Sequence, residues 1–211
     1  MPKGWFITFE AGEGTGKSTQ LRLLDDWLRA LGHRTVHSRE PGGTPLAEAV
    51  RAVLLDPALE PDGLSEIFLL EAARHDHVER VVRPAMAAGA VVLFDRFTDS
   101  SLVYQGLVRG LGLEEVEKLN QLATGGLEPD LTIILDMDPE VALARAHARN
   151  SEESVSGSRL DDEPSDFHRR IREGFLELAE RKPDRVRVID ADGPPEKVFA
   201  RIHPILPEAL R

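Results

Sequence analysis

The sequence contains no cysteine among its 211 residues. Disulfide bonds and thiolate metal sites are therefore excluded, because both require cysteine sulfur. The sequence also lacks any apolar run near the roughly 20 residues that span a bilayer. Its first residues, Met1-Pro2-Lys3-Gly4, do not resemble a targeting segment. We expect a cytoplasmic protein with no membrane segment.

Positive charge is outnumbered by negative charge in this chain. Lys and Arg number 26 against 37 Asp and Glu, which gives a formal net charge of −11. A general binder of nucleic acid polymers or anionic membrane surfaces is not expected, because the polyanion would be repelled. Any affinity for phosphate must come from a local group of cations. The length suits a single domain, residues 1–211, with at most a small lid.

Short apolar runs typical of buried strands recur between amphipathic segments. The five runs are residues 5–10, 34–38, 90–94, 131–136 and 186–189. Continuous runs such as 91–94 suit strands that are covered on both faces, as in a parallel sheet. Intervening segments such as 67–88 and 113–123 have helical character. The alternation predicts a three-layer α/β fold, with a five-stranded parallel sheet flanked by helices and ligands at the carboxyl ends of the strands.

One polar stretch, residues 150–166, interrupts this alternation. It has few apolar side chains that could anchor it to a core, so we expect a segment that becomes ordered when a ligand binds. We therefore predict a short mobile lid over about residues 145–163.

The most informative motif follows the first apolar run. It reads Ala11-Gly12-Glu13-Gly14-Thr15-Gly16-Lys17-Ser18-Thr19 and precedes a helix-like segment. Strand, Gly-rich turn and helix in this order are the context of a phosphate-binding P-loop. Backbone N–H groups and the helix dipole attract the anion, Lys17 can reach the outer phosphates, and the Ser18 hydroxyl can bind Mg²⁺. Ala11 replaces the first Gly of the usual pattern, and we expect Gly12 to keep the turn feasible.

A second motif runs from Asp95 to Gly106, where the third strand is expected to end. An acidic residue at this position lies beside a P-loop and can help to hold Mg²⁺, and Arg96 would face the phosphates. Ser101, Tyr104 and Gln105 fall on one turn at helical spacing and offer polar groups to one ligand. A helix cap at Asp95 and a surface arginine at Arg96 are the alternatives.

Five blocks of sequence, in this order, resemble the bacterial thymidylate kinase family. They are Phe6–Glu10 with the P-loop, Arg39–Leu46 with Arg51 downstream, Ala72–His77, Asp95–Gly106, and Arg159–Asp161 before Phe167 and His168. The P-loop alone indicates only a superfamily, whereas the blocks that begin at Arg39 and Asp95 are specific to this family. Together the blocks cover most of the chain.

The resemblance implies transfer of the ATP γ-phosphoryl group to dTMP, which gives dTDP and ADP, with Mg²⁺ as a cofactor. P-loop residues 11–19 should wrap the ATP phosphates, and Ser18 and Asp95 should hold the metal. Arg145, Arg149 and Arg159 are the expected lid arginines, with Arg159 the first choice to reach the transferring phosphoryl group. The predicted catalytic residues are Lys17, Asp95, Arg96 and Arg159.

The resemblance also assigns the acceptor site. The residues expected to bind dTMP are Glu10, Arg51, Leu70, Arg74, Arg96, Ser101, Tyr104 and Gln105. Arg51 and Arg96 should hold its phosphate, and Tyr104 should lie near the sugar and disfavour a 2′-hydroxyl. Arg74, Ser101 and Gln105 should read the thymine or its neighbourhood.

Leu70 is a departure from the family, which usually has a Phe stacking on thymine four residues before Arg74. Phe68 lies about 200° away from Leu70 around a helix. We therefore expect Phe68 to lie in the core on the opposite face rather than against the base.

The resemblance further implies a homodimer built from helices around residues 67–88 and 97–122. These helices must bury apolar positions such as Ile67, Val78 and Val82 somewhere. An intramolecular core would bury them equally well.

Other functions share the P-loop. A kinase for another nucleotide or a deoxynucleoside, or a catalytically silent nucleotide-binding module, would carry it too. A GTPase switch would need an Asn-Lys-x-Asp segment, which Leu135-Asp136-Met137-Asp138 does not provide. Arg145 and Arg149, four residues apart, also fit an exposed helical face.

Overall fold

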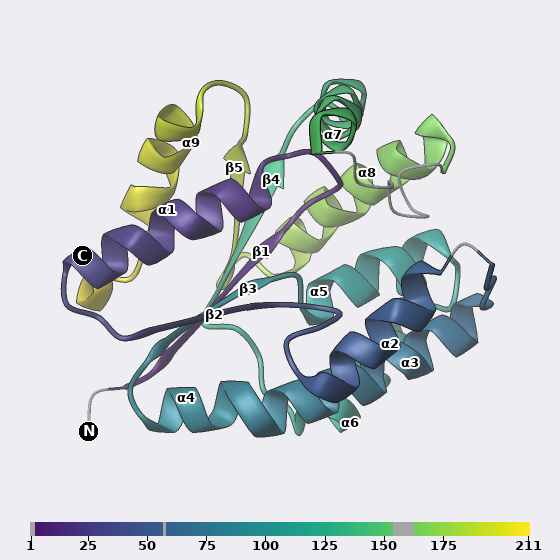
Figure 1. Ribbon diagram of the computed structural model, residues 1–211, viewed down its shortest axis with the longest axis horizontal. Coiled ribbons are helices and arrows are strands. Elements are labelled where there is room, and N and C mark those ends of the chain that lie inside the picture. Colours follow the sequence, from purple (N-terminus) through teal and green to yellow (C-terminus); the bar gives the residue numbers. More distant parts are fainter. Residues whose placement is uncertain (1–2, 57, 154–162) are drawn as a thin grey trace.

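A five-stranded parallel sheet forms the centre of the protein (Figure 1). The computed structural model describes residues 3–56, 58–153 and 163–211. The strands are β1 Trp5–Glu10, β2 Thr35–Arg39, β3 Val91–Asp95, β4 Leu131–Asp136 and β5 Val186–Asp190. They are arranged in the order β2-β3-β1-β4-β5, and every neighbouring pair is parallel. The predicted fold class is confirmed, and each strand boundary agrees with the predicted one to within one residue.

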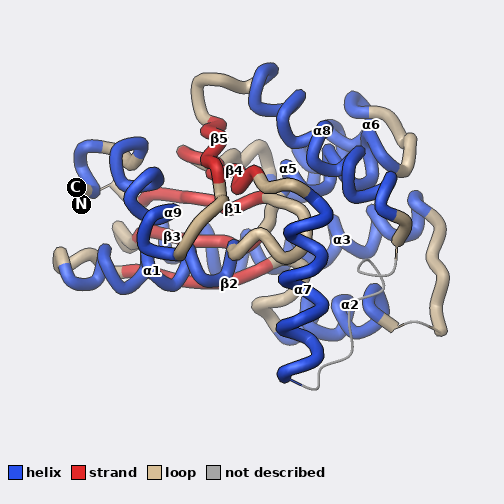
Figure 2. The backbone as a smooth tube through the Cα atoms, turned by 90° about the horizontal axis from the view of Figure 1, so that it is seen from above, coloured by secondary structure: helices blue, strands red, loops and turns tan. Residues whose placement is uncertain are grey.

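Side chains alternate across the sheet and so divide the core between its two faces. Ile7 and Phe9 of β1 pack against Leu21, Leu24 and Leu28 of helix α1 (Lys17–Ala30). Helix α9 (Pro195–Ile202) packs beside α1 on this face, as Figure 2 shows from above. The period of two residues in a strand sends Phe6 to the opposite face, where it contacts Phe94 and Phe97.

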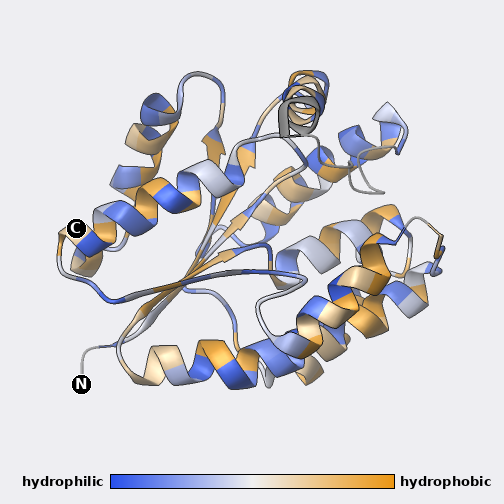
Figure 3. Cartoon of the chain, in the orientation of Figure 1, coloured by the Kyte–Doolittle hydropathy of each residue, from blue (hydrophilic) through white to orange (hydrophobic). Residues whose placement is uncertain are grey.

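The opposite face carries the larger group of helices. They are α3 Gly63–His77, α4 Arg83–Ala87, α6 Leu113–Thr124 and α8 Ser165–Arg181, together with α5 Thr98–Ser101 and the π-helical segment η2 Leu102–Val108. Figure 3 shows apolar residues concentrated in the strands and on one side of these helices. Ile67, Val103 and Phe175 from three of these elements share one cluster, so the third layer has a core of its own.

The segment predicted as one helix, 67–88, is longer and interrupted. It begins with α3 at Gly63, where the Asp62 carboxylate accepts a hydrogen bond from the Ser65 backbone N–H at 2.7 Å. A π-helical turn, η1 (Val78–Val82), separates α3 from α4. Pro84 lies in the first turn of α4, and proline removes a backbone donor and disturbs the helix just before it.

The remaining helices flank the carboxyl end of the sheet. They are α2 Pro45–Leu55 and α7 Pro139–Glu153, and short 3-10 turns, η3 His203–Ile205 and η4 Glu208–Leu210, close the chain. Helix α7 takes in part of the stretch predicted as a lid, while residues 154–162 lie outside the described part of the chain. In the described residues, no helix is long and apolar enough to cross a membrane.

Candidate active site

A cavity of about 660 Å³ opens at the carboxyl ends of β1 and β3. Parallel strands bring these ends to one edge of the sheet, which is where α/β proteins bind ligands. The P-loop, the end of β3 and the faces of α2, α3 and η2 line it. Of the residues predicted from sequence, those lining it are Glu13 to Thr19, Arg51, Leu70, Arg74, Asp95, Arg96, Ser101, Tyr104 and Gln105.

The P-loop turns through two glycines. Gly14 and Gly16 have φ of 70° and 90°, in the left-handed region that favours glycine. A Cβ at Gly14 would lie 1.8 Å from the Ala142 carbonyl oxygen, so α7 also requires glycine there. Gly12, which is predicted to keep the turn feasible beside Ala11, has no left-handed φ itself. Ala11 is 1% exposed and belongs to the core, which explains why a small apolar residue fits.

Lys17 and Ser18 begin helix α1 and face the cavity. The buried Lys17 ammonium donates to the Gly12 carbonyl at 3.0 Å, and burial together with nearby Arg96 lowers its pKa. The Ser18 hydroxyl donates to the Asp95 carboxylate at 3.2 Å. The strand-end carboxylate therefore lies beside the P-loop, as the sequence predicts.

Arg96 lies at the centre of the site. Its φ of 70° is unusual for a residue other than glycine and is typical of a constrained functional position. The guanidinium donates to the Ala11 carbonyl at 3.0 Å, to the Tyr104 hydroxyl at 3.2 Å and to the Glu13 carboxylate at 2.5 Å. Burial raises the pKa of Tyr104 to about 12, so its hydroxyl stays protonated. The surface-arginine alternative for Arg96 is wrong, since its side chain is only 16% exposed.

Glu10, which is predicted to be one of the acceptor-binding residues, lies outside the cavity lining and is fully buried. Its carboxylate accepts hydrogen bonds from the Phe97 backbone N–H at 2.7 Å and the Ser100 hydroxyl at 2.5 Å. Burial, with a contribution from Asp99, raises its pKa to about 8. Glu10 therefore anchors the residues that follow Arg96, and its burial argues against direct contact with a ligand.

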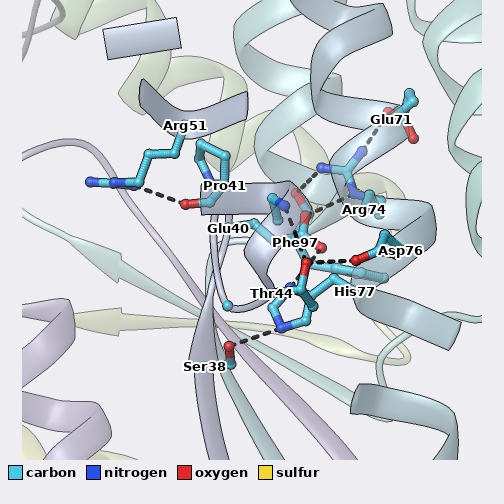
Figure 4. A network of polar contacts seen from close by, with 12 residues as sticks. Ser38, Glu40, Pro41, Thr44, Arg51, Glu71, Arg74, Asp76, His77 and Phe97 are labelled. Carbon is cyan, nitrogen blue, oxygen red and sulfur yellow. Dashed lines mark hydrogen bonds and ion pairs between the residues drawn. The ribbon is translucent and has the colours of Figure 1, made fainter. Parts of the chain in front are cut away.

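Arg51 reaches the cavity from α2 and is half-buried. It donates to the Pro41 carbonyl at 3.0 Å (Figure 4). Burial and the neighbouring Arg39 lower its pKa, and Arg96 is a further positive charge close by. Two arginines that repel each other across a cavity are well placed to share one anion.

Arg74 lies at the other end of the cavity, in a buried polar network (Figure 4). Its five N–H donors go to Glu40, Glu71, Asn120, Ser101 and the Phe97 carbonyl. Arg74 is predicted to read the base, yet every donor of its guanidinium is already in use. Direct reading would require it to exchange a protein acceptor for a ligand atom.

Of the two α3 residues discussed for base stacking, Leu70 lies where it is predicted and Phe68 does not. Leu70 lines the cavity, as predicted. Phe68 does not lie in the core on the opposite face, because 54% of it is exposed. It is also absent from the cavity lining, so no phenyl ring of α3 reaches the site.

The apolar positions considered for a dimer interface, Ile67, Val78 and Val82, are buried in core clusters within the chain. The alternative of an intramolecular core therefore applies to these three residues.

Of the three predicted lid arginines, only Arg145 has a side chain in the described part of the structure. Arg145 lies on α7, is exposed, and faces Asp192 at 3.6 Å, across from the loop after β5. Arg149 belongs to the same helix, but its side chain lies outside the described part of the structure. Arg159 lies outside the described residues.

Several acidic residues of the site were missed from sequence. Glu40, Glu66 and Glu71 are buried at the end of the cavity that holds Arg74. Glu40 has its pKa raised to about 7, chiefly by burial. Glu71, three residues before Arg74 on a helix, could have been found from the i, i+3 spacing. Glu66 could not, because its partner Gln105 is 39 residues away.

The fold and the cavity together define a P-loop phosphotransferase that acts on nucleotides. Residues 9–202 match the model of the family described as thymidylate kinase. A thymidylate kinase from Desulfovibrio desulfuricans is 48% identical over an alignment 211 residues long, which includes 98% of this chain and 96% of that protein. One from a Synechococcus species is 50% identical over 207 residues, or 97% of this chain and 96% of that protein.

A solved structure is also similar. The crystal structure of thymidylate kinase from Ehrlichia chaffeensis has a TM-score of 0.77 and 32% sequence identity to this chain. The match covers 98% of this chain and 100% of the Ehrlichia chain. The chain belongs to the thymidylate kinase family. It is therefore an ATP-dependent phosphotransferase of the family that phosphorylates dTMP to dTDP.

Proposed function

We propose that the cavity holds dTMP with its phosphate between Arg51 and Arg96 and its base beside Leu70, Ser101 and Gln105. The single observation that carries this proposal is the division of the cavity lining. Lys17, Arg51 and Arg96 gather at the strand ends, while the wall formed by α3 and η2 combines apolar and hydrogen-bonding groups. A phosphate fits the first end and a pyrimidine ring fits the second.

The phosphoryl donor, ATP, would place its phosphates on the P-loop. Backbone N–H groups at the start of α1 would donate to the anion, and Lys17 can exchange its Gly12 carbonyl partner for a phosphate oxygen. The acceptor phosphate has a second pKa of about 6, so its oxygen is already ionised at neutral pH and no general base is needed. These residues therefore act by alignment and by stabilising charge in the transition state.

We propose that Ser18 and Asp95 hold Mg²⁺. Their oxygens lie 3.2 Å apart at the edge of the cavity, beside the P-loop. Hydroxyl and carboxylate oxygens are hard ligands, which suits this ion. When bound, Mg²⁺ would supply positive charge between the ATP phosphates.

An exposed apolar patch supports the proposed homodimer. It consists of Leu64 and Phe68 on α3 and Leu122 on α6, which are 50%, 54% and 80% exposed. The His75 ring bonds to the Ala123 carbonyl at 2.9 Å, which joins the two helices. Large exposed apolar side chains on neighbouring helices are typical of a protein interface. A monomeric mass in light scattering at micromolar concentration would contradict the dimer, and Phe68→Asp should weaken it.

The lid and the location complete the proposal. The polar composition of 150–163 supports a segment that gains hydrogen-exchange protection when both substrate sites are filled, with Arg159 reaching the phosphoryl group. Equal exchange with and without a bisubstrate analogue would argue against it. We also propose a cytoplasmic location, which the lack of a membrane-spanning helix among the described residues supports.

The decisive experiment is a coupled ATP-consumption assay with dTMP, dUMP, UMP, CMP, AMP, GMP and thymidine as acceptors. Turnover should be fastest with dTMP and should require Mg²⁺. A different preferred acceptor would refute the proposed base site, and a nucleotide-binding module without turnover would give no signal with any acceptor.

A further inference from the structure

Glu66 and Gln105 form a buried pair in the wall of the cavity. Glu66 lies on α3 and Gln105 on η2, with relative exposures of 6% and 4%. The Gln105 side-chain amide nitrogen donates to the Glu66 carboxylate at 2.5 Å, and both residues line the cavity. Gln105 is one of the residues expected to read the base, whereas Glu66 has no assigned role.

The chemistry of this pair fixes the orientation of the glutamine. A side-chain amide has a donor end, the NH₂ group, and an acceptor end, the carbonyl oxygen. An ionised carboxylate only accepts hydrogen bonds, so it selects the NH₂ end. The Gln105 carbonyl oxygen must then point away from Glu66. Among the described residues, no protein donor bonds to this oxygen. It is also not one of the fully buried polar atoms that lack a hydrogen-bond partner, so a ligand in the cavity can reach it.

We propose that Glu66 is a specificity-determining positioning residue, which holds the Gln105 carbonyl oxygen toward the base so that it accepts the N3–H of thymine. This inference rests on the proposed place of the base. Cytosine presents a lone pair at N3, so two acceptors would oppose each other and cytosine would be rejected. A site that leaves a polar group facing a wrong partner discriminates strongly.

Arg74 and Ser101, the other residues expected to read the base, are less able to distinguish thymine from cytosine at N3. Arg74 uses all five of its donors on protein acceptors. The Ser101 hydroxyl accepts from Arg74 at 3.0 Å, and a hydroxyl rotates to donate or accept. The fixed amide of Gln105 is therefore the group that can distinguish a donor at N3 from an acceptor.

The test is Glu66→Gln, which keeps the size of the side chain and can keep a bond to Gln105 but removes the preference for one amide orientation. We expect the KM for dTMP to rise about 3- to 10-fold, with kcat within about twofold, because one ligand hydrogen bond is weakened. The inhibition constant of dCMP should fall, so the preference for dTMP over dCMP drops about tenfold or more. Glu79→Gln, an exposed substitution in the helical turn after α3, is the control and should change neither value.

Two more variants separate the possible failures. The exchange variant Glu66→Gln with Gln105→Glu again presents an acceptor oxygen to N3–H, so it should restore the preference for dTMP even if the single variant folds poorly. Gln105→Leu should abolish the preference. If Glu66→Gln keeps the wild-type preference while Gln105→Leu loses it, Glu66 does not position the amide. If Gln105→Leu also keeps it, the proposed place of the base is wrong.

Discussion

The two ends of the cavity are built differently. At the phosphate end, Lys17 and Arg96 bond to backbone carbonyls, to two hydroxyls and to one P-loop carboxylate, that of Glu13. At the base end, Arg74 is fully buried and all its donors are used by side chains and one carbonyl. Positive charge at the first end can change partners when phosphate arrives. Positive charge at the second end holds helices together. Removing a cation at the phosphate end should therefore lower activity, whereas removing Arg74 at the base end should lower stability.

The largest expected effect is at the phosphate end. Lys17→Ala and Arg96→Ala should each lower kcat about 100- to 1,000-fold, because each removes positive charge that we propose acts on the substrate phosphates. The melting temperature should change little for Lys17→Ala, since a buried, desolvated charge is removed. Steady-state kinetics and thermal unfolding measure both, with Lys118→Ala on the surface of α6 as the control. A Lys17→Ala protein with near-normal turnover would contradict this role.

The base end should show the reverse pattern. Arg74→Leu should destabilise the fold by about 3–5 kcal/mol, because it leaves Glu40 and Glu71 buried without their cation. Urea unfolding measures the loss. Adding Glu40→Gln and Glu71→Leu to this variant should recover part of it. If Arg74→Leu unfolds like the wild type but no longer binds dTMP, Arg74 is a base-reading residue rather than a structural one.

The pH dependence of stability provides a further comparison. The Glu10 pKa is about 8 in the folded protein against an ordinary value of 4.5, so the folded state binds a proton in that interval that the unfolded state has lost. The stabilisation from Glu10 is complete below pH 4.5, decreases as the pH rises, and is lost above about pH 8. Glu10→Gln should therefore gain stability relative to the wild type as the pH rises across this window, by at most about 1.4 kcal/mol per pH unit. Urea unfolding at several pH values tests this, and a constant difference would refute it.

The smallest expected effect concerns Leu70. Leu70→Phe places an aromatic ring against the cavity and should tighten dTMP binding by about 0.5–1.5 kcal/mol, because aromatic stacking on a base is worth about 1–3 kcal/mol and Leu already supplies part of it. Calorimetric titration with dTMP and with ATP measures the change, and ATP binding should stay the same. A stably folded variant with unchanged dTMP affinity would mean that the wall around Leu70 is shaped for an aliphatic side chain.

The sheet and the P-loop could be predicted because their signals are local. Runs such as Leu131–Leu135 are apolar throughout, which a strand buried on both faces requires. The prediction of the family, of the five-stranded parallel sheet and of the thymidylate kinase activity is confirmed. The dimer, Mg²⁺ binding, the lid and the roles of individual site residues remain predictions.

The errors have a common cause. The angle between Phe68 and Leu70 predicts a core position for Phe68, but a helical angle gives the direction of a side chain and not what lies opposite it. The partner surface for Phe68 is absent within the described chain, so it is exposed. The P-loop pattern predicts a role for Gly12 in the turn but does not tell which glycine needs a left-handed φ. In the structure these are Gly14 and Gly16, and α7 lies too close to Gly14 for a Cβ there.

The sequence by itself determined the fold class, the order of its elements and the phosphate-binding loop, because strand periodicity and the P-loop pattern act over neighbouring residues. Only the tertiary structure decided which charged and polar groups pair with each other. Glu13 pairs with Arg96 across 83 positions and Glu66 with Gln105 across 39. Such pairs depend on burial and on distances between elements that meet only after folding, and these determine whether an arginine can bind a ligand or supports the fold.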